Sequence, residues 1–307
     1  MLKKIIAIAA LSFVISPLVA QEDLLSLVED PNAGKNETVF ATFKTTKIVN
    51  SQSIETVKKG ALDFRVSHRF GDIGTGGSAH TLYGLDKVPD VRITFDYGVT
   101  NNWTVGFSRN VYRELLEGYT KLRFLEQTTN NKIPVSMALY ANMGYTPIVK
   151  DNFYAGVDPG VAQNAVQRLS YFSQLLIARK FNNWLSLQIM PSYHHRNFVR
   201  ADVNPNNKAE ESNGIFSCGI GGRIRFTKRI ALIADYFYTV SDFRTNNNGY
   251  YNPLAVGIEW ETGGHVFHMN FTNNSSISEN NFIPNTTSSW AKGEFKFGFN
   301  ISRVFTF

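Results

Sequence analysis

Apolar and polar residues alternate one by one along most of this chain, and this period of two restricts the fold more than any other feature. In residues 61–70, for example, the apolar Leu62 and Phe64 alternate with the charged Asp63 and Arg65. Successive side chains of a β-strand point to opposite faces, so each such segment has one apolar and one polar face. The pattern recurs to the last residue and predicts an all-β protein.

Twelve segments carry this pattern, and the links between them alternate in length, except that the link near Tyr112–Leu115 is short at a long-loop position. Short links such as Asn101–Asn102 and Asn182–Asn183 take turns with long polar links such as 145–167 and 273–290. Transmembrane β-barrels have short periplasmic turns and longer outer loops, and an even strand count returns both ends to the periplasm. We therefore expect an antiparallel transmembrane β-barrel of about twelve strands. The expected strands are 61–70, 91–99, 103–111, 116–127, 133–144, 168–181, 184–193, 214–226, 230–240, 251–260, 265–273 and 292–307.

The segment Val39–Asn50 is left over from this count. It fits a periplasmic extension, a plug in the lumen, or half of an extra hairpin that would raise the strand count to fourteen. The sequence leaves these alternatives open.

The first twenty residues have the features of a secretory signal peptide. Lys3 and Lys4 precede an almost unbroken apolar run, and Ala20 stands before the polar Gln21. We expect a cleaved signal peptide over residues 1–20, an N-terminal lead-in over 21–60 and the barrel over 61–307, in the bacterial outer membrane.

The last strand carries a separate signal. Its aromatic and aliphatic side chains occupy alternate positions up to the terminal phenylalanine, with Arg303 as the only break. This pattern resembles the carboxyl-terminal strand signal that the outer-membrane barrel assembly machinery recognises. The residues that carry it are Phe299, Ile301, Phe305 and Phe307.

Composition favours a barrel in lipid over a soluble β-sandwich. The polar faces are rich in Gly, Ser, Thr and Asn rather than in surface Lys and Glu. The single cysteine, Cys218, excludes a disulfide framework. The formal net charge of +6 is spread along the chain, so we expect no nucleic-acid partner. Aromatic residues flank the short links and resemble an interfacial girdle, namely Tyr97, Trp103, Phe124, Phe181, Trp184, Phe226, Trp260 and Phe267.

Two stretches resemble a known family. LDFRVSHRFGDI (Leu62–Ile73) and EGYTKLRFLEQ (Glu117–Gln127) are similar to an uncharacterised family of Bacteroidota outer-membrane β-barrels. The resemblance implies the fold and the location, and it supplies no activity.

Alternation places a group of charged side chains on the lumen face. They form either a constriction that selects solutes by charge or an internal ion-pair network that keeps a small barrel shut. The residues are Asp63, Arg65, Arg69, Arg92, Asp96, Lys121, Arg123 and Asp235.

No linear motif indicates catalysis, a metal or a cofactor. Adjacent His194 and His195 point apart on a strand, and His265 and His268 face opposite sides. A barrel-embedded hydrolase stays open as an alternative, because such enzymes assemble Ser, His and acidic residues from separate strands.

The leading expectation is therefore a non-enzymatic, porin-like barrel that passes or binds small solutes. Its expected partners are outer-membrane lipid, the assembly machinery during biogenesis, and small solutes. The second alternative is a closed barrel that is structural or binds a partner, with its lumen filled by side chains or by Val39–Asn50.

Overall fold

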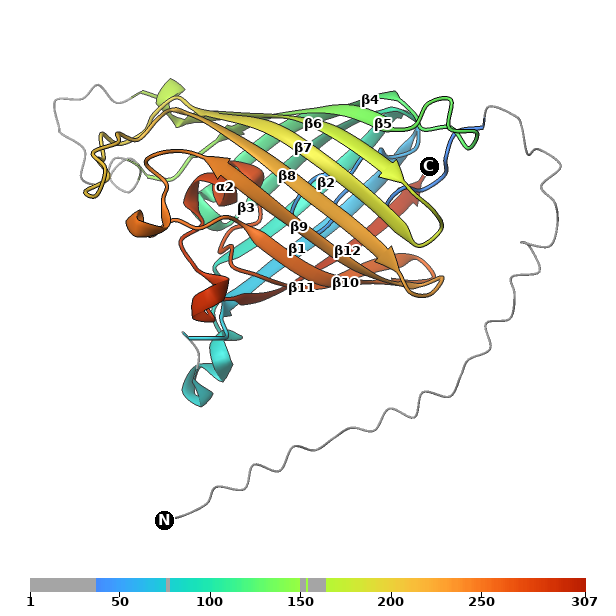
Figure 1. Cartoon of the computed structure of the whole chain (residues 1–307). Helices are drawn as coiled ribbons and strands as arrows, with labels where there is room; N and C mark the ends of the chain where they lie inside the picture. Colours follow the sequence, from blue (N-terminus) through green and yellow to red (C-terminus); the bar gives the residue numbers. More distant parts are fainter. Residues whose placement is uncertain (1–36, 76–77, 150–152, 154–163) are drawn as a thin grey trace, which may run out of the picture.

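The computed structural model describes residues 37–75, 78–149, 153 and 164–307 and shows a closed antiparallel β-barrel (Figure 1). Each strand pairs with its neighbours in the chain, and β1 pairs with β12. The prediction of a twelve-stranded barrel is confirmed. The strands are β1 (Ala61–Asp72), β2 (Asp90–Thr100), β3 (Trp103–Asn110), β4 (Leu116–Leu125), β5 (Ser136–Tyr145), β6 (Leu169–Lys180), β7 (Leu185–Arg196), β8 (Gly214–Arg225), β9 (Ile230–Val240), β10 (Leu254–Thr262), β11 (His265–Thr272) and β12 (Lys296–Thr306).

The two ends of the barrel differ as the link lengths indicate. The long links, together with the short link between β3 and β4, lie at one end, here called the long-loop end. The other short links and the carboxyl terminus lie at the opposite end, the short-turn end (Figure 1). Closure between β1 and β12 brings Ala61 opposite Thr306. The fourteen-strand alternative is wrong, because residues 39–50 contribute no strand to the barrel; Thr38 forms only an isolated bridge with Thr128.

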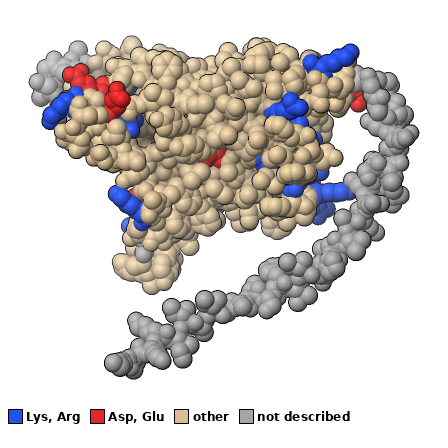
Figure 2. Space-filling view, viewed as in Figure 1, with Lys and Arg blue, Asp and Glu red and all other residues tan. Residues whose placement is uncertain are grey.

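The outer surface of the barrel is apolar. Figure 2 shows charged side chains gathered towards the two ends, with a broad, almost uncharged band between them on this face. Outward side chains of the strands, such as Phe95, Phe107 and Ile189, are 43 to 51% exposed in the isolated chain. Seven of the eight aromatic residues expected at the short-turn end are also exposed, and Phe267 is half-buried. No helix in the described ranges is both long and apolar enough to cross a membrane.

Several strand boundaries differ from the sequence prediction by two to four residues, and two of them have a clear local cause. The last strand begins at Lys296 rather than at 292, because Trp290–Lys292 forms a 3-10 turn that ends at Gly293 with φ of +75°. Glycine adopts this left-handed conformation without steric cost, and a strand does not continue through it. β10 begins at Leu254, directly after Pro253, which has no amide hydrogen for the ladder.

Two further segments fill the barrel. Residues 42–57, here called the lumen segment, enter from the short-turn end and are largely buried inside it. The short helix α2 (Glu279–Asn285), in the link between β11 and β12, enters at the long-loop end (Figure 1). The hydrophobic core lies inside the barrel between them: Phe43, Ile48 and Ile54 pack with Phe282 of α2 and with inward side chains of β4 to β7, β9 and β10. The predicted signal peptide lies outside the described residues.

Candidate functional site

The lumen segment folds back on itself inside the barrel. The Ile48 amide donates to the Ser51 carbonyl at 2.9 Å, and the Ser53 amide donates to the Thr46 carbonyl at 3.0 Å. Its tip packs against the wall at Gly221 of β8, where an added Cβ would lie 2.4 Å from Cδ1 of Ile48. The absence of a side chain at this position therefore makes room for the tip.

Asp235 of β9 holds the tip of the lumen segment. One of its carboxylate oxygens accepts hydrogen bonds from the amides of Val49, Asn50 and Ser51, at 3.2, 2.8 and 2.9 Å. It also accepts one from the Ser51 hydroxyl at 2.9 Å. Buried amides need acceptors, and a charged acceptor forms stronger hydrogen bonds than a neutral one. The single carboxylate thus satisfies the backbone of the tight turn.

Lys121 of β4 holds the base of the segment by donating hydrogen bonds, whereas Asp235 accepts them. Its ammonium donates to the backbone carbonyls of Thr46, Ser53 and Glu55, at 3.0, 2.9 and 2.9 Å. The side chain is buried, so these three carbonyls take the place of its water shell. One wall residue therefore ties the two arms of the lumen segment together.

Four more of the predicted lumen charges, three on β1 and one on β2, also contact this segment. The Thr46 hydroxyl donates to Asp63 at 3.2 Å and to Asp96 at 3.3 Å, and it accepts from Arg65 at 3.1 Å. Arg69 donates to the Asn50 side-chain oxygen at 2.7 Å. All four side chains are buried.

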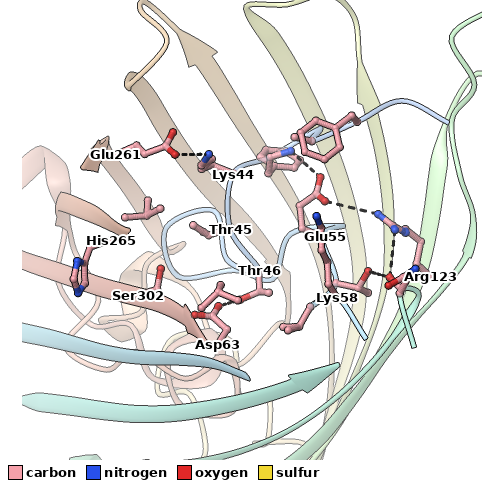
Figure 3. Close-up of a pocket in the computed structure, with 18 of the residues that line it drawn as sticks. Lys44, Thr45, Thr46, Glu55, Lys58, Asp63, Arg123, Glu261, His265 and Ser302 are labelled. Carbon is pink, nitrogen blue, oxygen red and sulfur yellow. Dashed lines mark hydrogen bonds and ion pairs between the residues drawn. The ribbon is translucent and has the colours of Figure 1, made fainter. Parts of the chain in front are cut away.

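At the short-turn end the structure leaves a cavity of about 720 Å³ between the lumen segment and the mouth (Figure 3). Arg123 lies here, partly exposed, 3.7 Å from Glu55 of the segment. Glu55 accepts a hydrogen bond from the Phe43 amide at 3.0 Å. Burial raises the pKa of the Glu55 carboxyl above its ordinary value, although the Phe43 amide and the Arg123 guanidinium act in the opposite direction. Lys44 pairs with Glu261 at 2.7 Å across the same mouth.

α2 is anchored at the long-loop end by a second charged group. Arg92 of β2 lies 2.9 Å from Glu117 of β4 and 3.5 Å from Glu279 of α2. Glu117 also accepts hydrogen bonds from the side chains of Ser278 and Asn280, which belong to the same link as α2. Phe282 of α2 packs inward against the wall in the core cluster.

The two inserted segments meet in the interior of the barrel. Lys47 of the lumen segment lies 2.8 Å from Glu279 of α2, and both side chains are at least nine-tenths buried. Gln52 adds a hydrogen bond to the same carboxylate at 3.4 Å. Burial lowers the pKa of Lys47 to about 8, although Glu279 acts in the opposite direction. The cavity at the short-turn end and one of about 280 Å³ at the long-loop end share no lining residue. The lumen between them is occupied in this conformation.

The eight charges expected from the sequence thus fall into two groups. Seven contact the lumen segment, among them Asp96 at Thr46 and Arg123 at Glu55, and the eighth, Arg92, holds α2. Sequence reasoning missed Lys47, Glu55, Glu117 and Glu279. Glu117 follows the strand alternation and was detectable, whereas Lys47 and Glu279 lie in segments without a period.

The predicted assembly signal lies on the outer face of β12. Phe299 stacks on His68 of β1 with ring centroids 5.3 Å apart, and Phe307 is 92% exposed. Ile301 is half-buried and Phe305 is exposed. Their role in assembly stays a prediction.

Histidine positions give no metal centre in the described part of the chain. His194 is buried on the lumen face with both ring nitrogens unpartnered, and no group of three or more His, Cys, Asp or Glu side chains gathers among the described residues.

A closed barrel with an apolar outer band and a charged, occupied interior defines a membrane-bound β-barrel protein. The chain belongs to the family described as membrane bound beta barrel domain (DUF5777), whose sequence model matches residues 43–305. The match begins at residue 43 and so includes nearly all of the lumen segment.

The comparison with solved structures finds porins at low sequence identity. The NanC porin is 9% identical, with a TM-score of 0.48, covering 80% of this chain and 99% of its own. The KdgM porin is 8% identical, with a TM-score of 0.43 and the same two coverages. OmpF of Salmonella typhi, in complex with daunomycin, is 9% identical, with a TM-score of 0.34, covering 80% of this chain and 96% of its own. No curated protein sequence matches the chain.

Proposed function

We propose that this protein is a non-enzymatic channel for small solutes in the bacterial outer membrane, closed in this conformation by the lumen segment and α2. On this proposal the chain is exported by the signal peptide over residues 1–20. The Bacteroidota origin suggested by Leu62–Ile73 and Glu117–Gln127 is part of the same proposal. The observation that carries it is that the charges on the barrel wall are the groups that hold the lumen segment.

Energetics favour a removable segment over a permanent core. Buried charges carry a desolvation cost, and apolar side chains of similar volume fill a space equally well. Apolar side chains fill a permanently closed lumen without the desolvation cost of Arg65, Lys121 and Asp235 on its wall. A barrel that opens needs such groups, because water and ions replace the segment when it leaves. The same wall that binds the segment is then a polar, charged pore.

Small solutes fit this wall better than large ones do. A twelve-stranded barrel is narrower than the sixteen- to eighteen-stranded barrels with a wide aqueous channel. With the lumen segment out, charges of both signs line the lumen, and Arg65, Arg69 and Lys121 lie on one side, from β1 to β4. We expect ions and small polar molecules to pass.

The second candidate is a permanently closed barrel that binds a partner. The buried Lys47–Glu279 pair favours it, because this pair links both inserted segments in one network. The hydrolase alternative gains no such support: in the described ranges, His194 has no hydrogen-bond partner and His268 lies beside Glu259 rather than a serine.

Single-channel recording in planar bilayers separates the two candidates. The wild-type chain should be closed most of the time, with brief openings. Lys121→Met removes the ammonium that binds three carbonyls, and it should raise the open fraction at least tenfold. Lys180→Met is the matched control, because Lys180 donates to the single Phe40 carbonyl, at 2.9 Å, in an exposed position. If the wild type and both variants fold but show no conductance, the channel proposal is wrong and the permanently closed barrel is the better candidate.

A further inference from the structure

A second cavity at the long-loop end lies between the link from β9 to β10 and the helix that closes the lumen. It measures about 340 Å³, which falls within the roughly 300 to 1,000 Å³ of small-molecule sites. Ile283 of α2 and Thr286 directly after the helix line one side, and residues from 238–252 line the other. The two sides are fastened together, because the Tyr251 amide donates to the Thr286 carbonyl at 2.9 Å. A molecule in this cavity therefore contacts the closing helix.

The charges at this cavity are balanced. Arg244 and Asp242 are the charged side chains that line it among the described residues. Behind the wall, Arg244 pairs with Glu211, which also lies 2.6 Å from Arg196. Two guanidinium groups and two carboxylates thus lie in the wall or directly behind it. Neither an anion nor a cation meets an excess of opposite charge here, which favours a neutral ligand.

Two side chains of this wall each keep one polar atom without a hydrogen-bond partner in the described part of the chain. The atoms are Oγ1 of Thr239 and Nη1 of Arg244, and both are buried. Buried polar atoms without a partner are rare in folded proteins, and a bound molecule often supplies the missing contact. The guanidinium nitrogen needs an acceptor, whereas the threonine hydroxyl both donates and accepts. An alcohol group satisfies either atom.

Tyrosine rings supply much of the remaining wall. Tyr238, Tyr250 and Tyr251 line the cavity. The Tyr250 ring is held between two neighbours: the ring centroid of Phe243 lies 5.7 Å from its own, and the guanidinium carbon of Arg244 lies 5.4 Å from it. A sugar has an apolar C–H face and a rim of hydroxyl groups. Aromatic rings pack against such a face, and amide, hydroxyl and carboxylate groups bind such a rim.

We propose that this cavity is a binding site for a neutral sugar. The hydroxyl groups of the sugar bind Thr239, Asp242 and Asn246, which line the cavity together. Its apolar face packs on Tyr250. The inference rests on the proposed function, since it names the class of solute that the channel takes from the long-loop side. The bound sugar also contacts Ile283, and so reaches the helix that closes the lumen.

Saturation transfer difference NMR measures this binding on the folded protein in micelles of an amine oxide detergent, which contains no sugar. The probes are D-glucose, D-galactose, D-mannose and N-acetyl-D-glucosamine in separate titrations, with sodium citrate as the anionic comparison. We expect a saturable signal from at least one sugar, and citrate should not displace it. Absence of a saturable signal from all four sugars would mean that the cavity holds water only. That result, or displacement of the bound sugar by citrate at similar concentrations, would overturn the inference.

Thr239→Val is the test variant, because it replaces the hydroxyl with a methyl group of similar size. That hydroxyl has no partner among the described residues, so its loss should leave folding unaffected. The dissociation constant of the sugar should nevertheless rise at least about threefold. Ser217→Ala is the matched control: Ser217 of β8 lies opposite Thr239, and its hydroxyl is also buried and unpartnered within the described ranges, but it does not line the cavity. Equal weakening by the two variants would contradict the proposed site.

Asp242→Ala is a second variant, at the exposed rim of the cavity. The Asp242 carbonyl accepts hydrogen bonds from Asn204 and Asn207, and these backbone contacts remain in the variant. Loss of the charged acceptor should weaken sugar binding about tenfold. If neither Thr239→Val nor Asp242→Ala weakens it, the sugar binds elsewhere and the inference is wrong.

The NMR titration does not depend on conductance. Sugar binding by a folded barrel that shows no conductance would therefore reject the channel alone. A conducting barrel that binds none of the four sugars would reject the sugar site and leave the channel.

Discussion

Lys47 and Glu279 are 232 positions apart in the chain and enter the barrel from opposite ends, yet their side chains meet at 2.8 Å inside it. This ion pair joins the lumen segment to α2. Movement of either segment therefore breaks a buried contact of the other. The pair makes the closed state one cooperative unit rather than two independent stoppers.

Loss of one member of this pair should open the channel. Lys47→Met or Glu279→Gln removes a charged hydrogen bond worth roughly 1.5 to 3 kcal/mol, so each should raise the ratio of open to closed channels about tenfold or more. The double variant should show less than the sum of the two effects, because the contact is lost only once. Single-channel recording gives all three ratios.

Lys44→Met is the control for that cycle. Lys44 belongs to the same segment and pairs with Glu261, but both side chains are about one-third exposed. Exposed ion pairs contribute roughly 0 to 1 kcal/mol. If Lys44→Met raises the ratio of open to closed channels as much as Lys47→Met does, loss of any charge from the segment opens the channel. The buried pair would then have no special role.

Closure should depend on pH through Glu55. The pKa of this carboxyl is raised in the closed state above its ordinary value of 4.5, so the closed state binds more protons than the open state. Closure is therefore fully favoured below pH 4.5 and weakens as the pH rises through the raised pKa. We expect the open fraction to increase across that window.

Glu55→Gln checks this assignment. The amide oxygen of glutamine still accepts from the Phe43 amide, but it does not titrate. The rise of open fraction with pH should flatten in this variant. An unchanged pH profile would show that a group other than Glu55 causes the pH dependence of the open fraction.

Space at the tip of the lumen segment should also control closure. Gly221→Ala puts a methyl group where Cδ1 of Ile48 lies, and it should displace the tip and raise the open fraction. Ile48→Val removes that Cδ1 and should restore part of the closure in the Gly221→Ala background. Gly118→Ala is the neutral control, because nothing lies within 4 Å of its added Cβ. Absence of rescue by Ile48→Val would contradict the packing shown here.

The terminal residue gives a prediction about assembly rather than gating. Phe307 is 92% exposed, so it contributes little to the packing of the described fold. Phe307→Ser should therefore refold in detergent as well as the wild type does, as judged by heat-dependent mobility in gels. In cells it should lower the amount of assembled barrel severalfold. Equal amounts of the wild type and Phe307→Ser in the outer membrane would show that Phe307 is not part of the assembly signal.

Local sequence pattern was sufficient to predict the barrel. The alternation at Leu62, Asp63, Phe64 and Arg65 identifies a strand and both of its faces, since the period of a strand belongs to the chain itself. The alternating link lengths then place each strand end. The predicted strand boundaries were wrong where a single turn residue determines the start of a strand, as at Gly293.

The interior was less predictable, for a physical reason. Asp235 stands out in the sequence as a carboxylate in the middle of a polar row, but nothing near it shows that it binds residues 49 to 51. That contact depends on how the strands converge in space. Residues 39–50 remained ambiguous in the sequence because they form no strand of the barrel, and their backbone is held in part by wall side chains such as Asp235 and Lys121.

Cysteine modification in a conducting bilayer shows whether the lumen segment leaves while the barrel stays folded. Ser53→Cys in a Cys218→Ser background places one thiol in the segment at a fully buried position. A charged methanethiosulfonate reagent should react only when the channel opens, and it should then lock the channel open, because the modified side chain no longer fits beside Lys121. If openings continue unchanged in the presence of the reagent, the segment stays in place while the channel conducts, and the proposal that it leaves is wrong.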